Sequence, residues 1–221
     1  MTDVLVIGGG AAASRAALAA AASGASVTMV LKKKLGKSGS TNYPGMNSIG
    51  VGSAWQAADG CGGSEDSPEV HYQDIMTAAA GMADARMAKI LAEESPERLL
   101  ELEKWGFELL ADPEGKRKHY SGYSCFASQP RAHGMMASKS GGHTGNMVES
   151  LAAEARRHDA EVHEGVTIVD LVVDGGECTG AVGLDRDGAT VFYRAGAVIM
   201  ATGGAAQMFP LSHTPGDITG D

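Results

Sequence analysis

The sequence predicts an α/β fold in which a central parallel sheet is combined with an antiparallel β-meander. Three observations carry this prediction. A short apolar run, Asp3–Ile7, passes through three glycines into an alanine-rich helical segment, which is the order of a βα unit. Near the end of the chain, alternating strands are separated by glycine turns. A fully apolar strand then follows, as expected at the centre of a parallel sheet.

The first βα unit contains a dinucleotide-binding pattern. The segment Gly8–Ala13 reads G-x-G-x-x-A between the strand and a helix that we expect to end at Ser23. Gly8 permits a tight turn, Gly10 lets the backbone approach a pyrophosphate, and Ala13 lets the helix pack closely on the strand. The phosphates would face the free amides at the helix N-terminus. The alternative interpretation is an ordinary glycine-rich βαβ turn.

A second strand, Ser26–Leu31, ends without the acidic residue that many dinucleotide folds use to bind ribose hydroxyls. Because leucine cannot do this, the ribose would use the main chain, Lys32 or water. The missing acid also argues against a plain NAD-dependent dehydrogenase. The lysines at positions 33, 34 and 37 lie next to the phosphate-binding motif and invite an electrostatic role, but a solvated loop is the favoured interpretation.

The middle of the chain is predicted to be helical. Helix-start signals occur at Ser67-Pro68-Glu69, Asp84, Ser95-Pro96-Glu97 and Thr144. The first of these helices is expected to end near Ala80, the third at Trp105-Gly106 and the last near His158. Between the third and the last, residues 116–140 show no period and are expected to form an irregular excursion over the edge of the bound ligand.

The C-terminal third is predicted to be mainly β. The expected strands are Glu161–Glu164, Val166–Val173, Cys178–Leu184, Thr190–Arg194 and Ala197–Ala201. Asp174-Gly175-Gly176 and Asp187-Gly188 are hairpin signals. The last strand ends in Thr202-Gly203-Gly204, and open α/β sheets hold their ligands at such carboxyl ends.

Composition excludes several classes of function. The 221 residues carry a net charge of −9, which argues against nucleic acid or an anionic membrane as the main partner. The cysteines at 61, 125 and 178 are odd in number and widely spaced, so we expect a reducing compartment, no disulfide framework and no metal site. The apolar N-terminal run follows no basic region and is split by glycines. We therefore expect a cytoplasmic protein without a membrane span.

This order of parts resembles the flavoprotein family that contains succinate dehydrogenase, fumarate reductase, L-aspartate oxidase and the α subunit of adenylylsulfate reductase. The matching segments extend over the whole chain and are Asp3–Ala13, Lys32, Ser38-Gly39-Ser40-Thr41, Asp66–Gly106, Thr144-Gly145, Val169-Asp170-Leu171, Ala201–Gly204 and Thr219-Gly220-Asp221. The resemblance implies a Rossmann-like FAD-binding fold and FAD as the cofactor in place of NAD.

The resemblance also implies which residues meet the cofactor. The pyrophosphate would lie over the glycine motif, the adenine against the main chain at Ile168, and the flavin near Ser40 and Thr41. Asp221 would reach the cofactor region. The full set of expected cofactor-binding residues is Gly8, Gly10, Ala11, Ala12, Ala13, Leu31, Lys32, Ser38, Gly39, Ser40, Thr41, Ile168, Ala201, Thr202, Gly203 and Asp221.

Two departures from the family pattern matter. Respiratory members carry a histidine, within a Ser-His-Thr triplet, that bonds covalently to the flavin, whereas this chain has Gly39-Ser40-Thr41. We therefore expect non-covalent FAD. Family members also continue well beyond Asp221 through a capping domain, and their dicarboxylate-binding residues and arginine proton donor lie in that later part. Residues 1–221 are thus expected to be the N-terminal portion of the FAD-binding domain, with the capping domain absent.

No catalytic residue can be assigned within this portion. His133 and His143 flank a glycine-rich loop that could face the flavin, and Arg131 lies nearby, but no carboxylate or nucleophile is spaced to complete a mechanism. The alternative interpretation is a polar surface loop.

The expected function is the FAD-binding portion of an oxidoreductase of the fumarate reductase or succinate dehydrogenase type. It would act on a small dicarboxylate and exchange electrons with a partner subunit. The alternatives are L-aspartate oxidase and a catalytically inert FAD-binding fragment. A nicotinamide-binding subunit without flavin is disfavoured by Leu31 and by the family order. We expect this portion alone to be inactive.

Overall fold

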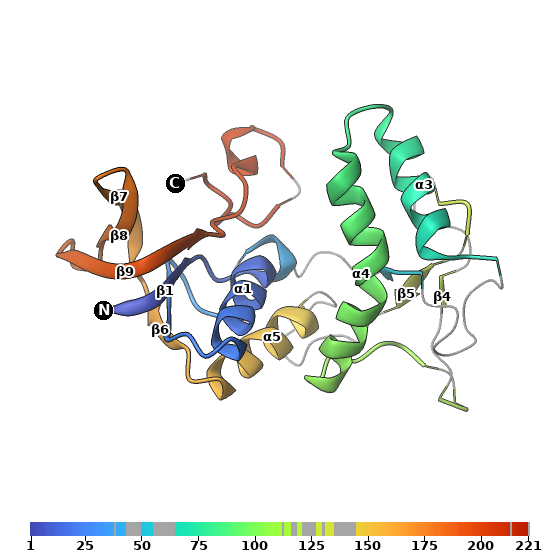
Figure 1. The fold of residues 1–221 in the computed structure, drawn as a ribbon, viewed down its shortest axis with the longest axis horizontal. Helices are drawn as coiled ribbons and strands as arrows, with labels where there is room; N and C mark the ends of the chain where they lie inside the picture. The colour runs from blue at the N-terminus through green and yellow to red at the C-terminus, as the bar shows by residue number, and fades with distance from the viewer. Residues whose placement is uncertain are drawn as a thin grey trace. The chain divides into compact units, whose positions relative to one another are not determined.

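The computed structural model describes residues 1–37, 39–42, 50–54, 65–111, 113–115, 119–120, 127–129, 131–134, 145–212 and 214–220. The chain divides into two compact units. Figure 1 shows the ribbon coloured by residue number. The first unit contains Met1–Gly45 and Ser140–Asp221, and the second contains Met46–Lys139.

A six-stranded sheet organises the first unit, in the order β6-β2-β1-β9-β8-β7. The strands are β1 (Thr2–Ile7), β2 (Val27–Leu31), β6 (Glu161–Glu164), β7 (Thr167–Asp174), β8 (Glu177–Leu184) and β9 (Thr190–Met200). β1 pairs in parallel with β2 and β9, and β2 pairs in parallel with β6. β7, β8 and β9 form an antiparallel meander. The predicted α/β class, with a parallel sheet and a meander, is confirmed.

Strand β9 belongs to both parts of this sheet. Its first half pairs with β8, and the half that begins at Ala195 pairs with β1. The prediction of two separate strands, Thr190–Arg194 and Ala197–Ala201, was therefore wrong. Gly196 lies between them, where a side chain would approach the carbonyl oxygen of Asp3 at 3.1 Å. One continuous strand thus carries the chain from the meander into the parallel sheet.

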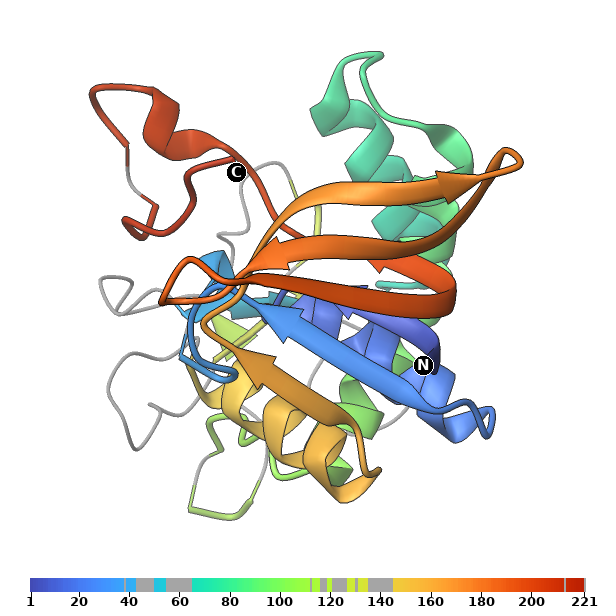
Figure 2. The same cartoon turned by 90° about the vertical axis from the view of Figure 1, so that its left-hand side faces the viewer.

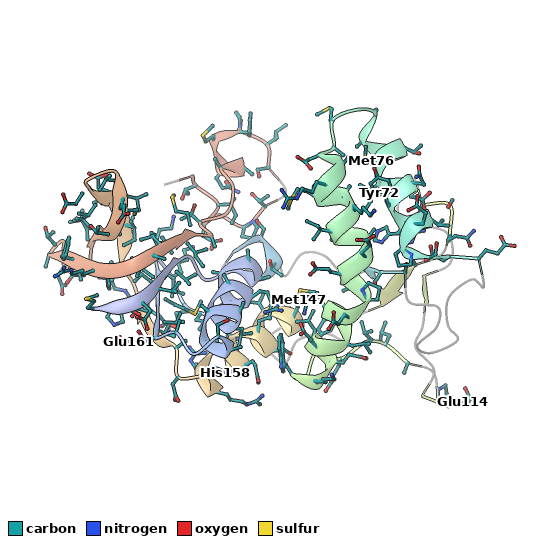
Figure 3. The ribbon with its side chains drawn as sticks, in the orientation of Figure 1. Tyr72, Met76, Glu114, Met147, His158 and Glu161 are labelled. Carbon is teal, nitrogen blue, oxygen red and sulfur yellow. The ribbon has the colours of Figure 1, made fainter. Side chains whose placement is uncertain are left out.

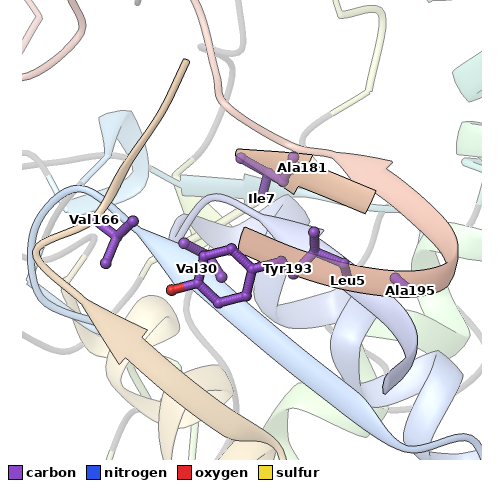
Figure 4. Close-up of a cluster of buried hydrophobic side chains, with 7 residues drawn as sticks. All are labelled: Leu5, Ile7, Val30, Val166, Ala181, Tyr193 and Ala195. Carbon is purple, nitrogen blue, oxygen red and sulfur yellow. The ribbon is translucent and has the colours of Figure 1, made fainter. Parts of the chain in front are cut away.

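The parallel strands are covered by helices and by the meander. α1 (Ala11–Ala22) packs on β1 and β2 and also against α5 (Gly145–Arg157). Figure 2 shows the meander, in orange and red, folded across the blue strands β1 and β2. Leu5, Ile7 and Val30 of the parallel strands form a buried cluster with Tyr193 of the meander (Figure 4). The other members of this cluster are Val166, Ala181 and Ala195. Burial of these side chains holds the layers together.

The meander turns form as their glycines predict. Gly175 and Gly176 make the two-residue loop between β7 and β8, with φ angles of +58° and +88°. Positive φ at both positions is the type I′ geometry that matches the twist of antiparallel strands. In the next loop, the Asp185 carboxylate accepts hydrogen bonds from the amides of Asp187 and Ala189.

The described residues of the second unit form two helices and a small sheet. α3 (Pro68–Ala79) and α4 (Ala85–Lys104) pack together, and Tyr72 and Met76 of α3 lie beside α4 (Figure 3). The strands β3 (Gly50–Gly52), β4 (His119–Tyr120) and β5 (Ala132–Gly134) form an antiparallel sheet in the order β3-β5-β4. Ser67 and Asp84 cap α3 and α4 as predicted. Their side chains accept hydrogen bonds from the main-chain amides of Val70 and Met87, respectively.

The helix predicted to begin at Ser95-Pro96-Glu97 does not exist as a separate element. α4 is continuous through Pro96. An interior proline removes one helical hydrogen bond and costs about 3 kcal/mol. Burial of Ala88 and Ala92 before the proline and of Leu99 after it offsets that cost. Leu99 belongs to the buried core, whereas Leu100, Leu102 and Trp105 are only partly buried.

Within the described part of the chain, no helix has both the length and the apolar character that a membrane crossing requires. Thr144, the predicted cap of α5, lies outside the described residues.

Candidate functional site

A cavity of about 540 Å³ opens at the carboxyl ends of β1, β2 and β9 in the first unit. Its volume lies within the range of about 300–1,000 Å³ that small-molecule sites occupy. The start of α1, the segment 39–41, the first part of β7 and the segment 217–220 complete its walls. This is the edge at which open α/β sheets bind their ligands.

Gly8 is required by the packing of β1 against β9. Its φ angle is +128°, and a side chain would come within 2.2 Å of the Ala201 carbonyl oxygen. The neighbouring main chain is fixed by hydrogen bonds from Gly8 N to Val30 O and from Ala201 N to Ile7 O, both 2.8 Å. The fold itself therefore demands glycine at this position.

Gly10 differs from Gly8, because the protein leaves open space where a larger residue at position 10 would place its side chain. A Cβ at Gly10 would meet no atom of the described residues within 4 Å, whereas one at Gly9 would lie 2.5 Å from Leu31 Cδ1. Gly10 is the N-cap of α1, with an extended backbone that other residues adopt readily. Glycine at position 10 thus keeps the cavity open.

The N-terminus of α1 gives this part of the cavity the character of an anion site. Ala11 and Ala12 line it, and the amides of a first helical turn have no partner within their own helix. The N-cap residue, Gly10, has no side chain that could accept a hydrogen bond from these amides. The helix dipole adds positive potential. A phosphate diester fits this combination of free amides and open space.

The end of β2 joins three parts of the cavity wall. Leu31 is 3% exposed, and its carbonyl oxygen accepts the amides of Gly165 and Val166, which lead into β7. The Lys32 ammonium donates a hydrogen bond of 2.7 Å to the Thr219 hydroxyl. Ile168 lines the wall on β7.

The segment 39–41 closes over the start of α1. A side chain at Gly39 would lie 3.3 Å from Gly10 Cα, and the φ angle of Gly39 is +86°. Its amide donates to Asp217 Oδ2 at 3.0 Å. Ser40 and Thr41 follow in a short 3-10 turn and line the cavity.

The structure brings most of the predicted cofactor-binding residues to this one cavity. Those that line it are Gly8, Gly10, Ala11, Ala12, Leu31, Lys32, Gly39, Ser40, Thr41, Ile168, Ala201, Thr202 and Gly203. Ala13 is fully buried behind the wall, with its Cβ 3.5 Å from where a Gly8 side chain would begin. Ser38 and Asp221 lie outside the described residues.

Several lining residues were not predicted. They include Gly9, Lys33, Val169, Asp170, Asp217 and Ile218. Gly9 could have been found, because it stands inside the glycine motif. Asp217 gave no usable signal, because its hydrogen-bond partner is 178 residues away in the sequence.

Arg131 belongs to the second unit and is not a surface residue. It is 3% exposed and donates to Asp66 Oδ1 at 2.5 Å and to Asp74 Oδ2 at 2.6 Å. Burial opposes its charge, but these carboxylates raise the pKa of Arg131 above its ordinary value. The interpretation as a polar surface loop is therefore wrong for Arg131, which is a buried ion-pair residue. The side chain of His133 and the whole of His143 lie outside the described residues.

The comparisons with known proteins agree on one family. The FAD binding domain family matches residues 3–219. A fumarate reductase (CoM/CoB) subunit of Methanothermobacter marburgensis is 32% identical over 217 residues, which cover 95% of this chain and 36% of that protein. L-aspartate oxidase of Caulobacter vibrioides is 29% identical over 177 residues, which cover 78% of this chain and 33% of that protein.

Solved structures give the same result. Mycobacterium smegmatis Sdh1 in complex with UQ1 is 29% identical and has a TM-score of 0.84, with 100% of this chain and 37% of that chain covered. The present chain therefore spans about a third of the length of these relatives.

Proposed function

Because this chain belongs to the FAD binding domain family, whose cofactor is FAD, we propose that FAD occupies the cavity at the carboxyl ends of β1, β2 and β9. The observation that carries this proposal is the open space at Gly10 beside the N-terminus of α1. No packing within the described residues explains a glycine there, whereas close approach of a pyrophosphate does.

The remaining walls suggest how the cofactor is oriented. The pyrophosphate would lie over Gly8–Ala13, and Thr202 and Gly203 would close its other side. Ser40 and Thr41 would lie toward the flavin, and the main chain at Ile168 would meet the adenine. We assign Ser38 and Asp221 to the same site from the family pattern alone.

We propose that FAD is held without a covalent bond. Ser40 stands where a flavin-linked histidine would be expected, and a hydroxyl group does not form that bond. Among the described residues that line the cavity, none is histidine, cysteine or tyrosine. Affinity would then come from the amides of α1, from the walls and from Lys32.

FAD supplies hydride transfer, and this chain would supply its binding and orientation. We propose that the complete protein acts on a small dicarboxylate, in the manner of fumarate reductase or succinate dehydrogenase. The similarity to the M. marburgensis fumarate reductase protein over 95% of the chain supports this reaction. L-aspartate oxidase is the second candidate, favoured by the similarity to the C. vibrioides enzyme over 78% of the chain.

We further propose a cytoplasmic location and an electron-transfer partner. The M. marburgensis relative is named as one subunit of its enzyme, which supports an assembly with a second chain. Residues 1–221 alone would bind FAD without appreciable turnover. Positioned acid–base groups contribute about a hundredfold or more to rates, and no substrate-binding or proton-donating group is assigned within this portion.

The proposal is tested by titrating the purified chain with FAD and with NAD. Saturable quenching of flavin fluorescence and no response to NAD are expected. Micromolar NAD binding without an FAD response would overturn the cofactor assignment. The FAD-loaded chain is then assayed with reduced viologen and fumarate, and with aspartate and oxygen. Turnover within about tenfold of the typical enzyme median of about 10 per second would show that this portion carries catalytic residues.

A further inference from the structure

We propose that the adenosine end of this cavity also recognises a phosphate group on the ribose, through the ammonium group of Lys33. The ligand class is an adenine nucleotide phosphorylated on a ribose hydroxyl, and such a nucleotide would compete with FAD for the empty chain. This inference rests on the proposed function, because it places adenosine at the end of β2.

The first observation is that the end of β2 offers no carboxylate. Leu31 is buried and packs closely against Gly9. A Cβ atom on Gly9 would lie 2.5 Å from Leu31 Cδ1. Dinucleotide folds that bind an unmodified ribose usually hold its hydroxyls with an acidic residue at this place. A carboxylate there would repel a ribose phosphate, and this chain has leucine at that position.

The second observation distinguishes the two lysines that follow. The Lys32 ammonium is bound to the Thr219 hydroxyl at 2.7 Å. Lys33 also lines the cavity, yet its side chain is exposed and makes no hydrogen bond or ion pair with the residues that the structure describes. Lys33 therefore presents an uncommitted positive charge at the cavity wall.

The third observation concerns the carboxylates on the same walls. Asp217 accepts the Gly39 amide, and Asp170 accepts the amide of Leu171. Neither forms an ion pair with Lys33 in the described part of the chain. Lys33 thus has no ion-pair partner among the described residues, and a phosphate dianion would supply one. An ammonium group binds phosphate as a point charge, so it can serve either ribose position.

The test compares ligands that differ only in the added phosphate. Calorimetric titration of the FAD-free chain at low salt uses 5′-AMP, adenosine 2′,5′-bisphosphate and adenosine 3′,5′-bisphosphate. At least one bisphosphate is expected to bind about tenfold more tightly than 5′-AMP and to displace FAD at correspondingly lower concentration. The two bisphosphates distinguish the 2′ from the 3′ position. Added salt should reduce the advantage, because it screens an exposed charge.

Lys33→Ala should remove most of this advantage. Lys34→Ala is the matched control, because it removes the same charge from the next residue, whose side chain does not line the cavity. Equal affinity of wild type for all three nucleotides, or an equal advantage in both variants, would overturn the proposal. A failure of FAD itself to bind would instead contradict the proposed function, and the calorimetric comparison does not depend on FAD.

Discussion

The Asp217 carboxylate accepts a hydrogen bond from the main-chain amide of Gly39 at 3.0 Å. This bond joins two walls of the cavity that lie at opposite ends of the first unit's sequence. On one side, Gly39 lies against Gly10, where a pyrophosphate would be held. On the other side, Thr219 lies two residues after Asp217, and its hydroxyl accepts a hydrogen bond from the Lys32 ammonium group. The cavity thus depends on long-range bonds between loops as well as on the sheet.

Asp217→Ala should loosen the segment 39–41 and weaken FAD binding. A hydrogen bond to a charged group contributes about 1.5–3 kcal/mol, so a loss of roughly tenfold in affinity is expected. Fluorescence titration measures it. Asp217→Asn keeps an acceptor oxygen and should restore most of the affinity. Equal losses in both variants would show that the charge of Asp217, and not its hydrogen bond, is what matters.

Replacement of Gly8 and of Gly10 should have opposite consequences. Gly8→Ala forces a side chain into the Ala201 carbonyl oxygen at positive φ, so the free energy of unfolding should fall by at least about 1–3 kcal/mol. Gly10→Thr keeps a residue of similar N-cap preference, so the chain should remain folded. Its side chain would occupy the open space and should reduce FAD affinity by about tenfold or more. Denaturant unfolding and FAD titration measure the two effects.

A loss of stability in Gly10→Thr equal to that in Gly8→Ala would contradict the assignment of Gly10 to the ligand. Normal FAD affinity in Gly10→Thr would place the pyrophosphate elsewhere.

Acid precipitation of the FAD-loaded chain should release all of the flavin into the supernatant. Ser40 provides no imidazole for a covalent bond, and Ser40→Ala should behave in the same way. The absorbance of pellet and supernatant at the flavin maximum measures this. Yellow colour that stays in the denatured pellet would show a covalent bond to another residue.

Local sequence patterns predicted most helices, strands and turns. The sheet edge at which the cavity lies could be predicted from the order of those strands. The glycine motif, the caps at Ser67 and Asp84 and the Gly175-Gly176 turn each depend on neighbouring residues, and each forms as expected. The position of the cavity agrees with the rule that ligands bind at the carboxyl ends of parallel strands.

The errors arose where distant contacts decide the outcome. Pro96 looked like a helix start, but the burial of Ala92 and Leu99 on one face keeps α4 continuous. Likewise, two strands were expected on either side of residues 195–196, yet β9 is continuous there because its two halves pair with different strands. The pairing of Asp217 with Gly39 could not be predicted, because nothing in the sequence near either residue specifies the other.

The pH dependence of the second unit should follow His71 and Asp74. Burial, followed by the nearby charge of Arg131, lowers the pKa of His71, whose Nδ1 has no partner among the described residues. Burial alone would raise the pKa of Asp74, but hydrogen bonds from Ser128 and Arg131 outweigh it and leave that pKa lowered. Both groups therefore bind a proton less readily in the folded chain than in the unfolded chain.

The unfolded state thus takes up protons first as pH falls, so each group removes stability on acidification. The contribution of His71 should be fully present above its unfolded pKa of about 6.5 and decline below it. The contribution of Asp74 should be present above about 3.9 and decline below that value. Hydrogen exchange of α3 amides, expressed as opening free energies, should therefore show two successive decreases between pH 7 and pH 3.

His71→Gln should abolish the first decrease, while His158→Gln, at an exposed site in the first unit, should leave the profile unchanged. An opening free energy that rises as pH falls from 7 to 5 would contradict the burial of a neutral His71.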